Sequence, residues 1–79
     1  MKADQRLDIS EVVIPVSLAL CKSTLAQMAA GAVLEIRLRD YDTLQDLLII
    51  AERSGDHVLS WEKQDEYYYL WLRKNPECR

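Results

Sequence analysis

The sequence predicts an α+β two-layer sandwich, in which two helices cover one face of a four-stranded mixed sheet and the other face is open. Three observations lead to this prediction. Four segments alternate apolar and polar residues as strands do, two segments repeat apolar residues at helical spacing, and their order is β-α-β-α-β-β. A helical crossover between the first two strands makes them parallel, with a right-handed connection.

The composition is that of one small globular domain, and it disfavours some classes of function. The chain has 79 residues, 49% of them hydrophobic, so we expect a single domain over 1–79 with an ordered core at 6–74. The net charge of −3 disfavours nucleic acid as a partner. The uncharged runs are too short to span a membrane, ten residues at 12–21 and twelve at 23–34. Without a signal peptide or a disulfide framework, we expect a cytoplasmic protein that uses no cofactor.

The first strand is predicted over residues 6–10, where apolar and polar side chains alternate. The first helix follows over 15–30. Pro15 suits its first turn, because the missing N–H would have no partner there. Gly31 is expected to end this helix in a left-handed conformation. The buried stripe of the helix consists of Leu18, Cys21, Leu25 and Met28.

The second strand, 33–39, has the clearest alternation in the chain. A second helix follows it, begins at a capping box made by Asp42 and Gln45, and is closed by Gly55. The residues expected to face the core are Leu34, Ile36 and Leu38 in the strand, and Leu44, Leu47, Leu48 and Ala51 in the helix.

The last two strands are predicted as a hairpin, 58–63 and 66–74, with Gln64 and Asp65 as the central turn residues. This register fixes which side chains share a face. Its facing pairs on the core side are Trp61 with Tyr68 and Leu59 with Leu70, and Leu72 continues that face. A slip of one residue would exchange the two faces.

The same register places Tyr67, Tyr69 and Trp71 together on the open face, beside Arg37 and Arg39 of the second strand. Aromatic residues favour strands, so these rings can be purely structural. Three large rings exposed together can also form an adhesive patch that marks an interface. Stacking of nucleic acid bases on the sheet is a third alternative, which the acidic net charge disfavours.

The residue before Pro15 lies at the mouth of the first helix, where free backbone N–H groups point outward. A cysteine at this point would be an activated thiolate, because the helix N-terminus favours negative charge. The residue in this chain is Ile14. A position suited to a reactive sulfur therefore carries a hydrocarbon.

At this point the chain resembles the TusA-like, or SirA-like, family of small sulfur-carrier proteins, over roughly residues 7–74. In that family a Cys-Pro-x-Pro motif opens the first helix, and its cysteine accepts sulfur as a persulfide from a cysteine desulfurase or another donor. The residues that carry the resemblance are Leu7-Asp8, Pro15, Leu18, Lys22, Leu25, Gly31, Leu34-Glu35-Ile36, Asp40, Asp46 and Gly55.

The departures from the family pattern concern the chemistry rather than the core. Ile14 stands at the position of the persulfide cysteine, Ser17 at that of the second proline, and Glu11 at that of the turn glycine. Tyr41-Asp42-Thr43 replaces the usual Pro-Gly-Ala, and Leu20 occupies a position that is often lysine. The resemblance therefore implies the family's fold without its sulfurtransferase reaction, since isoleucine offers no acceptor for sulfur.

Two other thiols are available in principle. Cys21 lies on the apolar stripe of the first helix, where a buried, inert cysteine is expected. Cys78 lies near the C-terminus, with nothing predicted nearby to activate it. His57 is a lone histidine, so we expect no metal site.

We therefore expect no catalytic residue and a non-catalytic binding or regulatory module whose partner is a protein, such as a sulfur-transfer protein. The candidate binding residues are Ile14, Pro15, Val16 and Ser17 at the helix mouth, with Val13 beside them, and Tyr67, Tyr69, Trp71, Arg37 and Arg39 on the sheet. Two alternatives stay open: an active sulfur carrier that uses Cys21 or Cys78, and a homodimer formed through the aromatic sheet face.

Overall fold

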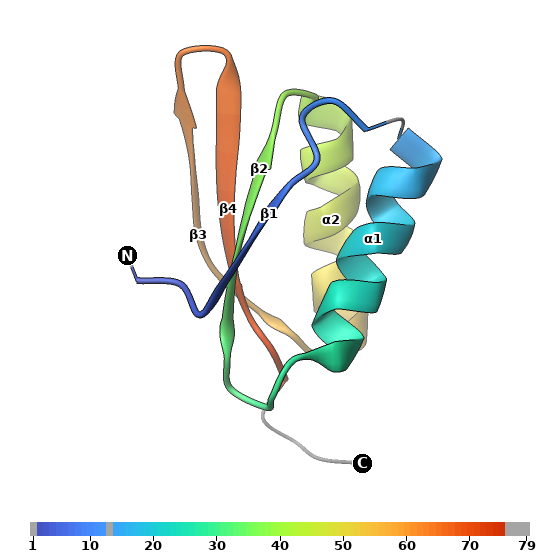
Figure 1. The fold of residues 1–79 in the computed structure, drawn as a ribbon, viewed down its shortest axis with the longest axis vertical. Coiled ribbons are helices and arrows are strands. Elements are labelled where there is room, and N and C mark those ends of the chain that lie inside the picture. Colours follow the sequence, from blue (N-terminus) through green and yellow to red (C-terminus); the bar gives the residue numbers. More distant parts are fainter. Residues whose placement is uncertain (1, 13, 76–79) are drawn as a thin grey trace.

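The fold class predicted from the sequence is confirmed. The structure is a computed structural model that describes residues 2–12 and 14–75, with Ile14 described by its backbone alone. Its elements are β1 (Gln5–Asp8), α1 (Ile14–Gln27), β2 (Val33–Leu38), α2 (Tyr41–Ser54), β3 (His57–Gln64) and β4 (Tyr67–Arg73). Both helices lie on one side of a four-stranded sheet (Figure 1).

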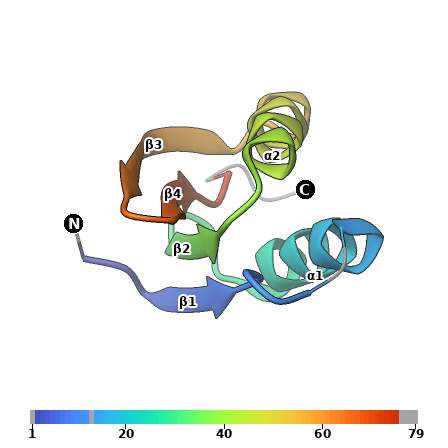
Figure 2. The same ribbon diagram turned by 90° about the horizontal axis from the view of Figure 1, so that it is seen from above.

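The sheet has the strand order β1-β2-β4-β3. β1 pairs with β2 in parallel, and the other two pairings are antiparallel. Seen from above, α1 lies on the β1 side of the sheet, while α2 lies next to β3 and β4 (Figure 2). None of the helices in the described part of the chain is long and apolar enough to cross a membrane.

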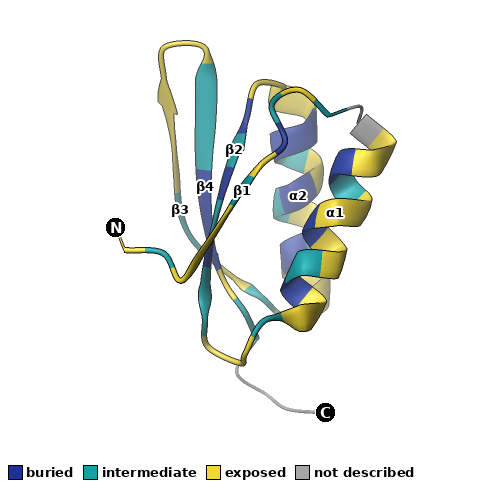
Figure 3. Ribbon diagram, viewed as in Figure 1, coloured by how far each residue is buried: buried dark blue, intermediate teal, exposed yellow. Residues whose placement is uncertain are grey.

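The core lies between the helices and the central strands β2 and β4. Leu34, Ile36 and Leu38 are at most 1% exposed, which confirms the alternation predicted for β2. β4 adds Leu70 and Leu72 to the same layer. Buried residues follow the inner sides of both helices, and the outer sides are exposed (Figure 3). The helices contribute Cys21, Leu25, Leu44, Leu47 and Ala51 to the core.

α1 ends at Gln27, three residues before the predicted end at Ala30. At this end, one carbonyl of the last turn is bonded to partners outside the helix. The Leu25 carbonyl accepts a 3.2 Å hydrogen bond from the Met28 N–H, and one of 2.6 Å from the Lys74 ammonium. Gly31 is left-handed as expected, with φ +83°, but it lies in the following loop. β1 likewise ends earlier than predicted, at Asp8.

The N-cap of α2 is Asp40, so the predicted capping box at Asp42 is wrong. Asp40 has an extended backbone, and its Oδ2 accepts hydrogen bonds from the Thr43 N–H (2.9 Å) and the Thr43 hydroxyl (2.7 Å). These bonds satisfy one free donor of the first turn and bury Thr43. At the other end Gly55 caps the helix with φ +79°, as predicted.

The hairpin turns at Asp65 and Glu66, one residue later than predicted, because Gln64 pairs with Tyr67. Asp65 takes the positive φ of 57° that the tight turn needs. Trp61 therefore faces Leu70 rather than Tyr68. The register differs from the prediction by two residues, so each side chain of β4 keeps its predicted face.

Leu59 has no facing partner, because an irregularity in β3 falls between Val58 and Ser60. The predicted pair of Leu59 with Leu70 is therefore wrong. A bulge of this kind bends an edge strand and discourages pairing with a further strand.

We expect Leu34→Ala to lower the free energy of unfolding by about 2–5 kcal/mol, because it removes a completely buried side chain from the central strand. Leu20→Ala is the matched control, since Leu20 is 39% exposed on α1 and should cost less than about 1 kcal/mol. Urea unfolding followed by circular dichroism measures both. Equal losses of unfolding free energy in the two variants would contradict the core described here.

Candidate functional site

The loop that leads to the helix mouth is held by short backbone contacts. The Ser10 N–H donates to Asp8 Oδ1 at 2.9 Å, and the Val12 N–H donates to the Ile9 carbonyl at 3.2 Å. Ile9 itself is 4% exposed, and its N–H donates to the Arg37 carbonyl at 2.9 Å. The carboxyl end of β1 and the start of α1 are thus fixed relative to β2.

α1 begins at Ile14, directly before Pro15, so the first-turn N–H groups lie where the sequence predicted a helix mouth. Val13 and the side chain of Ile14 lie outside the described residues. Ser17 is 2% exposed, and its hydroxyl donates to the Val12 carbonyl at 3.0 Å. Ser17 therefore supports the loop from inside and offers no side chain to a contact surface.

The hollow beside the helix mouth is small, with a volume of about 60 Å³ between α1, α2 and the end of β2. Ser17, Asp40 and Thr43 are among its lining residues. This volume suits a water molecule or two rather than an organic substrate. The helix mouth is therefore a surface and not an enclosed pocket.

The N-terminal half of the outward face of α1 is apolar. Val16 is 49% exposed and Leu20, one turn later, is 39% exposed. Pro15 and Ala19 are exposed beside them. Lys22 is the single charged residue of the fourteen in this helix. A surface helix ordinarily turns charged residues to solvent, so this face has the character of a contact surface.

Cys21 is the one cysteine among the described residues, and it belongs to the core. Its side chain is 1% exposed, and burial raises the pKa of its thiol to about 11. A neutral, inaccessible thiol is neither a nucleophile nor a sulfur acceptor. Cys78 lies outside the described residues.

The described residues contain no group of three or more His, Cys, Asp or Glu side chains that could hold a metal ion. His57 is exposed at the start of β3. A hollow of about 530 Å³ lies between the C-terminal ends of the helices, and Asp56 and Lys74 are among its lining residues. Both groups are engaged: Asp56 accepts from the Asn75 N–H at 2.7 Å, and the Lys74 ammonium binds the Leu25 carbonyl.

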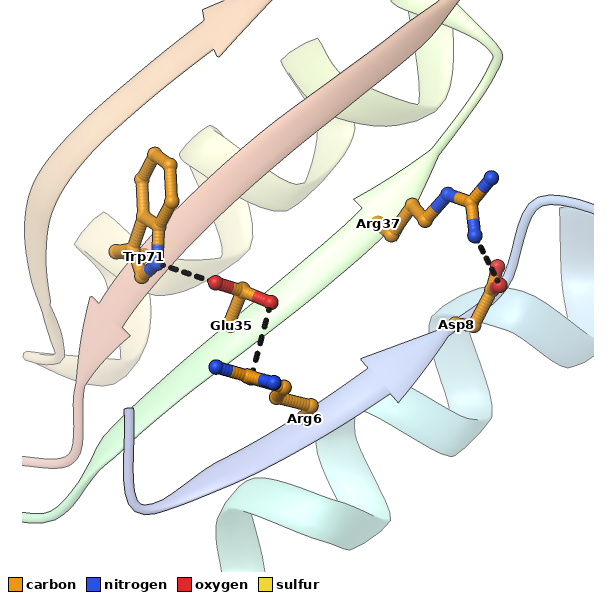
Figure 4. A network of polar contacts seen from close by, with 5 residues as sticks. All are labelled: Arg6, Asp8, Glu35, Arg37 and Trp71. Carbon is orange, nitrogen blue, oxygen red and sulfur yellow. Dashed lines mark hydrogen bonds and ion pairs between the residues drawn. The ribbon is translucent and has the colours of Figure 1, made fainter. Parts of the chain in front are cut away.

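The open face of the sheet carries a polar network rather than an exposed aromatic patch (Figure 4). Glu35 accepts a hydrogen bond from the Trp71 indole N–H at 2.9 Å and pairs with Arg6 at 3.3 Å. Tyr69 stacks on Trp71 with ring centroids 6.2 Å apart. Trp71 is only 8% exposed as a result, so the expectation that it is freely available on this face is wrong.

A second set of contacts covers the other end of this face. The Arg37 guanidinium lies 3.8 Å from the centroid of the Tyr67 ring and pairs with Asp8 at 3.3 Å. Arg39 lies 5.4 Å from the same ring and pairs with Glu66 at 3.0 Å. The predicted proximity of the two arginines to the aromatic strand is therefore correct, but Tyr67 is only half-exposed beneath them.

Asp8 links this face to the helix mouth. Hydrogen bonds from the Ser10 hydroxyl and N–H lower the pKa of its carboxyl, and the charge of Arg37 acts in the same direction. Asp8, Ser10, Arg37 and Tyr67 are among the residues that line an open hollow of about 360 Å³. Its arginine is paired with the Asp8 carboxylate, and Glu11 adds a further negative charge to the lining, so the hollow does not suit an anionic substrate.

The aromatic rings that are most exposed lie on the opposite side of the sheet. Trp61 is 40% exposed and Tyr41 is 49% exposed, and both contact Tyr68. The sequence prediction placed Trp61 in the core, and it treated Tyr41 only as part of a departure from the family pattern. The tip of the hairpin extends beyond the start of α2 (Figure 1). Trp61 lies near that tip, where its neighbour from the helix layer is Tyr41 at the first position of α2.

Comparisons with known proteins identify the family. The family model for sulfurtransferase TusA matches residues 5–74. A putative sulfur carrier protein of Aquifex aeolicus is 29% identical over 99% of this chain, and the chain spans 40% of that relative's length. The sulfur carrier protein TusA of Allochromatium vinosum is 25% identical, over 91% of this chain and 95% of its own length.

A solved structure shares the fold. The crystal structure of a SirA-like protein from Desulfitobacterium hafniense superposes with a TM-score of 0.79 at 22% sequence identity. The match covers 90% of this chain and 97% of that chain.

We expect Cys21 to resist alkylation by iodoacetamide at pH 8 in the folded protein. With a pKa of about 11, roughly one thiol in a thousand is ionised, and the core shields it from the reagent. Mass spectrometry of a Cys78→Ser variant isolates this residue, and denaturation in urea should make it react. Rapid alkylation of the folded variant would contradict the buried position of Cys21.

We expect Asp8→Asn to destabilise the fold at pH 7 by about 0.2–1 kcal/mol, the range of exposed charged contacts. Asparagine keeps an oxygen that can accept a hydrogen bond. It lacks the negative charge that the Ser10 hydroxyl, the Ser10 N–H and the Arg37 guanidinium stabilise. Because the folded-state pKa lies below the ordinary 3.8, this stability is present above pH 3.8 and is lost as the pH falls through the folded pKa. Urea unfolding of both proteins from pH 7 to pH 2.5 measures this, and a difference that is constant across the range would contradict it.

Proposed function

Because the chain belongs to the TusA family, we propose that it is a sulfur-transfer-related domain that carries no persulfide and binds sulfur-transfer proteins as a non-catalytic module. In this proposal Ile14 replaces the family's persulfide cysteine at the first helix. The domain acts in the cytoplasm and contributes recognition, while any sulfur chemistry belongs to its partners.

The single observation that carries the proposal is the position of Cys21. It is the only thiol of the described chain, it is 1% exposed, and its pKa is about 11. A carrier must present a thiolate to its donor protein. Cys21 is thus a poor substitute for a cysteine at position 14, where the N-terminus of α1 would stabilise the negative charge.

The apolar face of α1 supports the binding role. Val16 and Leu20 are exposed one turn apart, directly after the helix mouth, on a helix with one charged residue. The fully buried core of a protein interface is more apolar than the rest of the protein surface, so this part of α1 suits contact with a partner. We infer that a partner protein docks on Pro15, Val16 and Leu20.

A transfer experiment tests the non-carrier role. The protein is incubated with a cysteine desulfurase and sulfur-labelled cysteine, and the label is then located by mass spectrometry. We expect no label on the wild type and labelling of an Ile14→Cys variant, whose thiol would lie at the helix N-terminus. Label on the wild type that disappears in Cys78→Ser or Cys21→Ser would contradict the proposal and favour an active carrier that uses a displaced thiol.

A binding experiment tests the docking role separately. We expect a Val16→Ala, Leu20→Ala double variant to bind a cysteine desulfurase about tenfold more weakly than the wild type does in calorimetry, since two apolar side chains leave the interface. Ile49→Ala is the matched control, because Ile49 is 48% exposed on α2. No binding by the wild type, or equal losses in both variants, would refute docking on α1.

A further inference from the structure

Two buried polar side chains meet at one small hollow of the molecule. Ser17 is 2% exposed and Thr43 is 3% exposed, and the described residues contain no other buried polar or charged side chain. Both line the hollow of about 60 Å³ beside the helix mouth. Because burial of a hydroxyl costs free energy unless hydrogen bonds replace its contacts with water, the presence of both at one hollow indicates a site for a polar molecule.

The hollow lies between the first turns of the two helices. Ser17 is the fourth residue of α1 and Thr43 is the third residue of α2. Both helices begin at the same end of the molecule (Figure 1). Ile9 and Leu38, which are at most 4% exposed, form part of the apolar lining. A molecule bound in the hollow would therefore contact the starts of both helices at the edge of the core.

The two buried hydroxyl groups donate their hydrogens to protein acceptors. Ser17 donates to the Val12 carbonyl at 3.0 Å, and Thr43 donates to Asp40 Oδ2 at 2.7 Å. A hydroxyl that donates its hydrogen still has two lone pairs that can accept hydrogen bonds. Ser17 Oγ and Thr43 Oγ1 can therefore accept from a small molecule between them, and that molecule has to be a hydrogen-bond donor.

The size and charge of the hollow limit the kind of molecule that it can hold. Its volume of about 60 Å³ is too small for an organic ligand, whereas a water molecule takes up roughly 30 Å³ in the liquid. The carboxylate of Asp40 belongs to the lining and would repel an anion. A buried water needs two to four polar partners, and the oxygens of Ser17 and Thr43 provide two acceptors for its two hydrogens.

We propose that this hollow is a binding site for a water molecule that bridges the first turns of α1 and α2. The water donates one hydrogen to Ser17 Oγ and the other to Thr43 Oγ1. A hydrogen bond through water is nearly as favourable in enthalpy as a direct one, so the bridge fixes the start of α1 relative to α2. Ser17 and Thr43 are positioning residues in this role, which does not depend on what docks on α1.

Oxygen-17 magnetic relaxation dispersion tests the proposal, because it counts the water molecules that stay bound to the full chain for many nanoseconds. We expect Thr43→Val, which has a similar shape and no hydroxyl, to hold about one such water fewer than the wild type. Ser17→Ala should lose the same water, so a second variant is available if one fails to fold. Thr43→Ser keeps the hydroxyl and should keep the water. Ser23→Ala is the control for loss of an exposed hydroxyl from α1.

An equal count of bound water in the wild type, Thr43→Val and Ser17→Ala would overturn the proposal. A cation is the rival occupant, since a carboxylate lines the hollow. Titration with ammonium chloride, followed by amide NMR signals against a sodium chloride control, should give no saturable shift at residues 17 and 43. Saturable shifts there with ammonium alone would assign the hollow to a cation and refute the water bridge. Neither measurement involves a partner protein, so this proposal and the docking role of α1 can fail separately.

Discussion

One apolar layer holds the described part of the molecule together. It is made by alternate residues of β2 and β4 on one side and by the inner faces of α1 and α2 on the other. β2 is central to it, because Leu34, Ile36 and Leu38 are all nearly inaccessible while β1 and β4 pair with its two edges. Cys21 belongs to this layer, so the packing that stabilises the fold also withdraws its thiol from chemistry.

The second face of the sheet is closed by polar contacts instead of a further layer. Glu35 joins Arg6 to the Trp71 indole, and Arg37 joins Asp8 to the Tyr67 ring. Tyr67 and Trp71 each contact a charged side chain of β2, and Tyr69 stacks on Trp71 within β4, so none of these three rings is fully exposed. The exposed large apolar side chains of the described residues lie on α1, on α2 and on β3, namely Val16, Leu20, Tyr41, Ile49, Val58 and Trp61.

Periodicity was sufficient to predict the fold, because the core residues of β2 and α2 repeat at spacings that allow one interpretation. Periodicity did not predict the features that depend on contacts between residues distant in the sequence. The end of α1 depends on Lys74, which is forty-nine positions from Leu25. The cap of α2 could be Asp40 or Asp42, and Thr43 decided between them. The surroundings of Trp61 include Tyr41 from the start of α2, and those of Trp71 include Glu35 from β2, and the pattern of a single strand reveals neither contact.

The central claim is that this TusA-family chain carries no sulfur of its own. The most direct measurement is the intact mass of the full-length protein, isolated from its own cells with a thiol-trapping reagent present throughout. The account predicts that the cysteines of every molecule carry no attached sulfur, both after ordinary growth and after growth with added cysteine. A trapped persulfide on Cys21 or Cys78 in a reproducible fraction of the protein would contradict it.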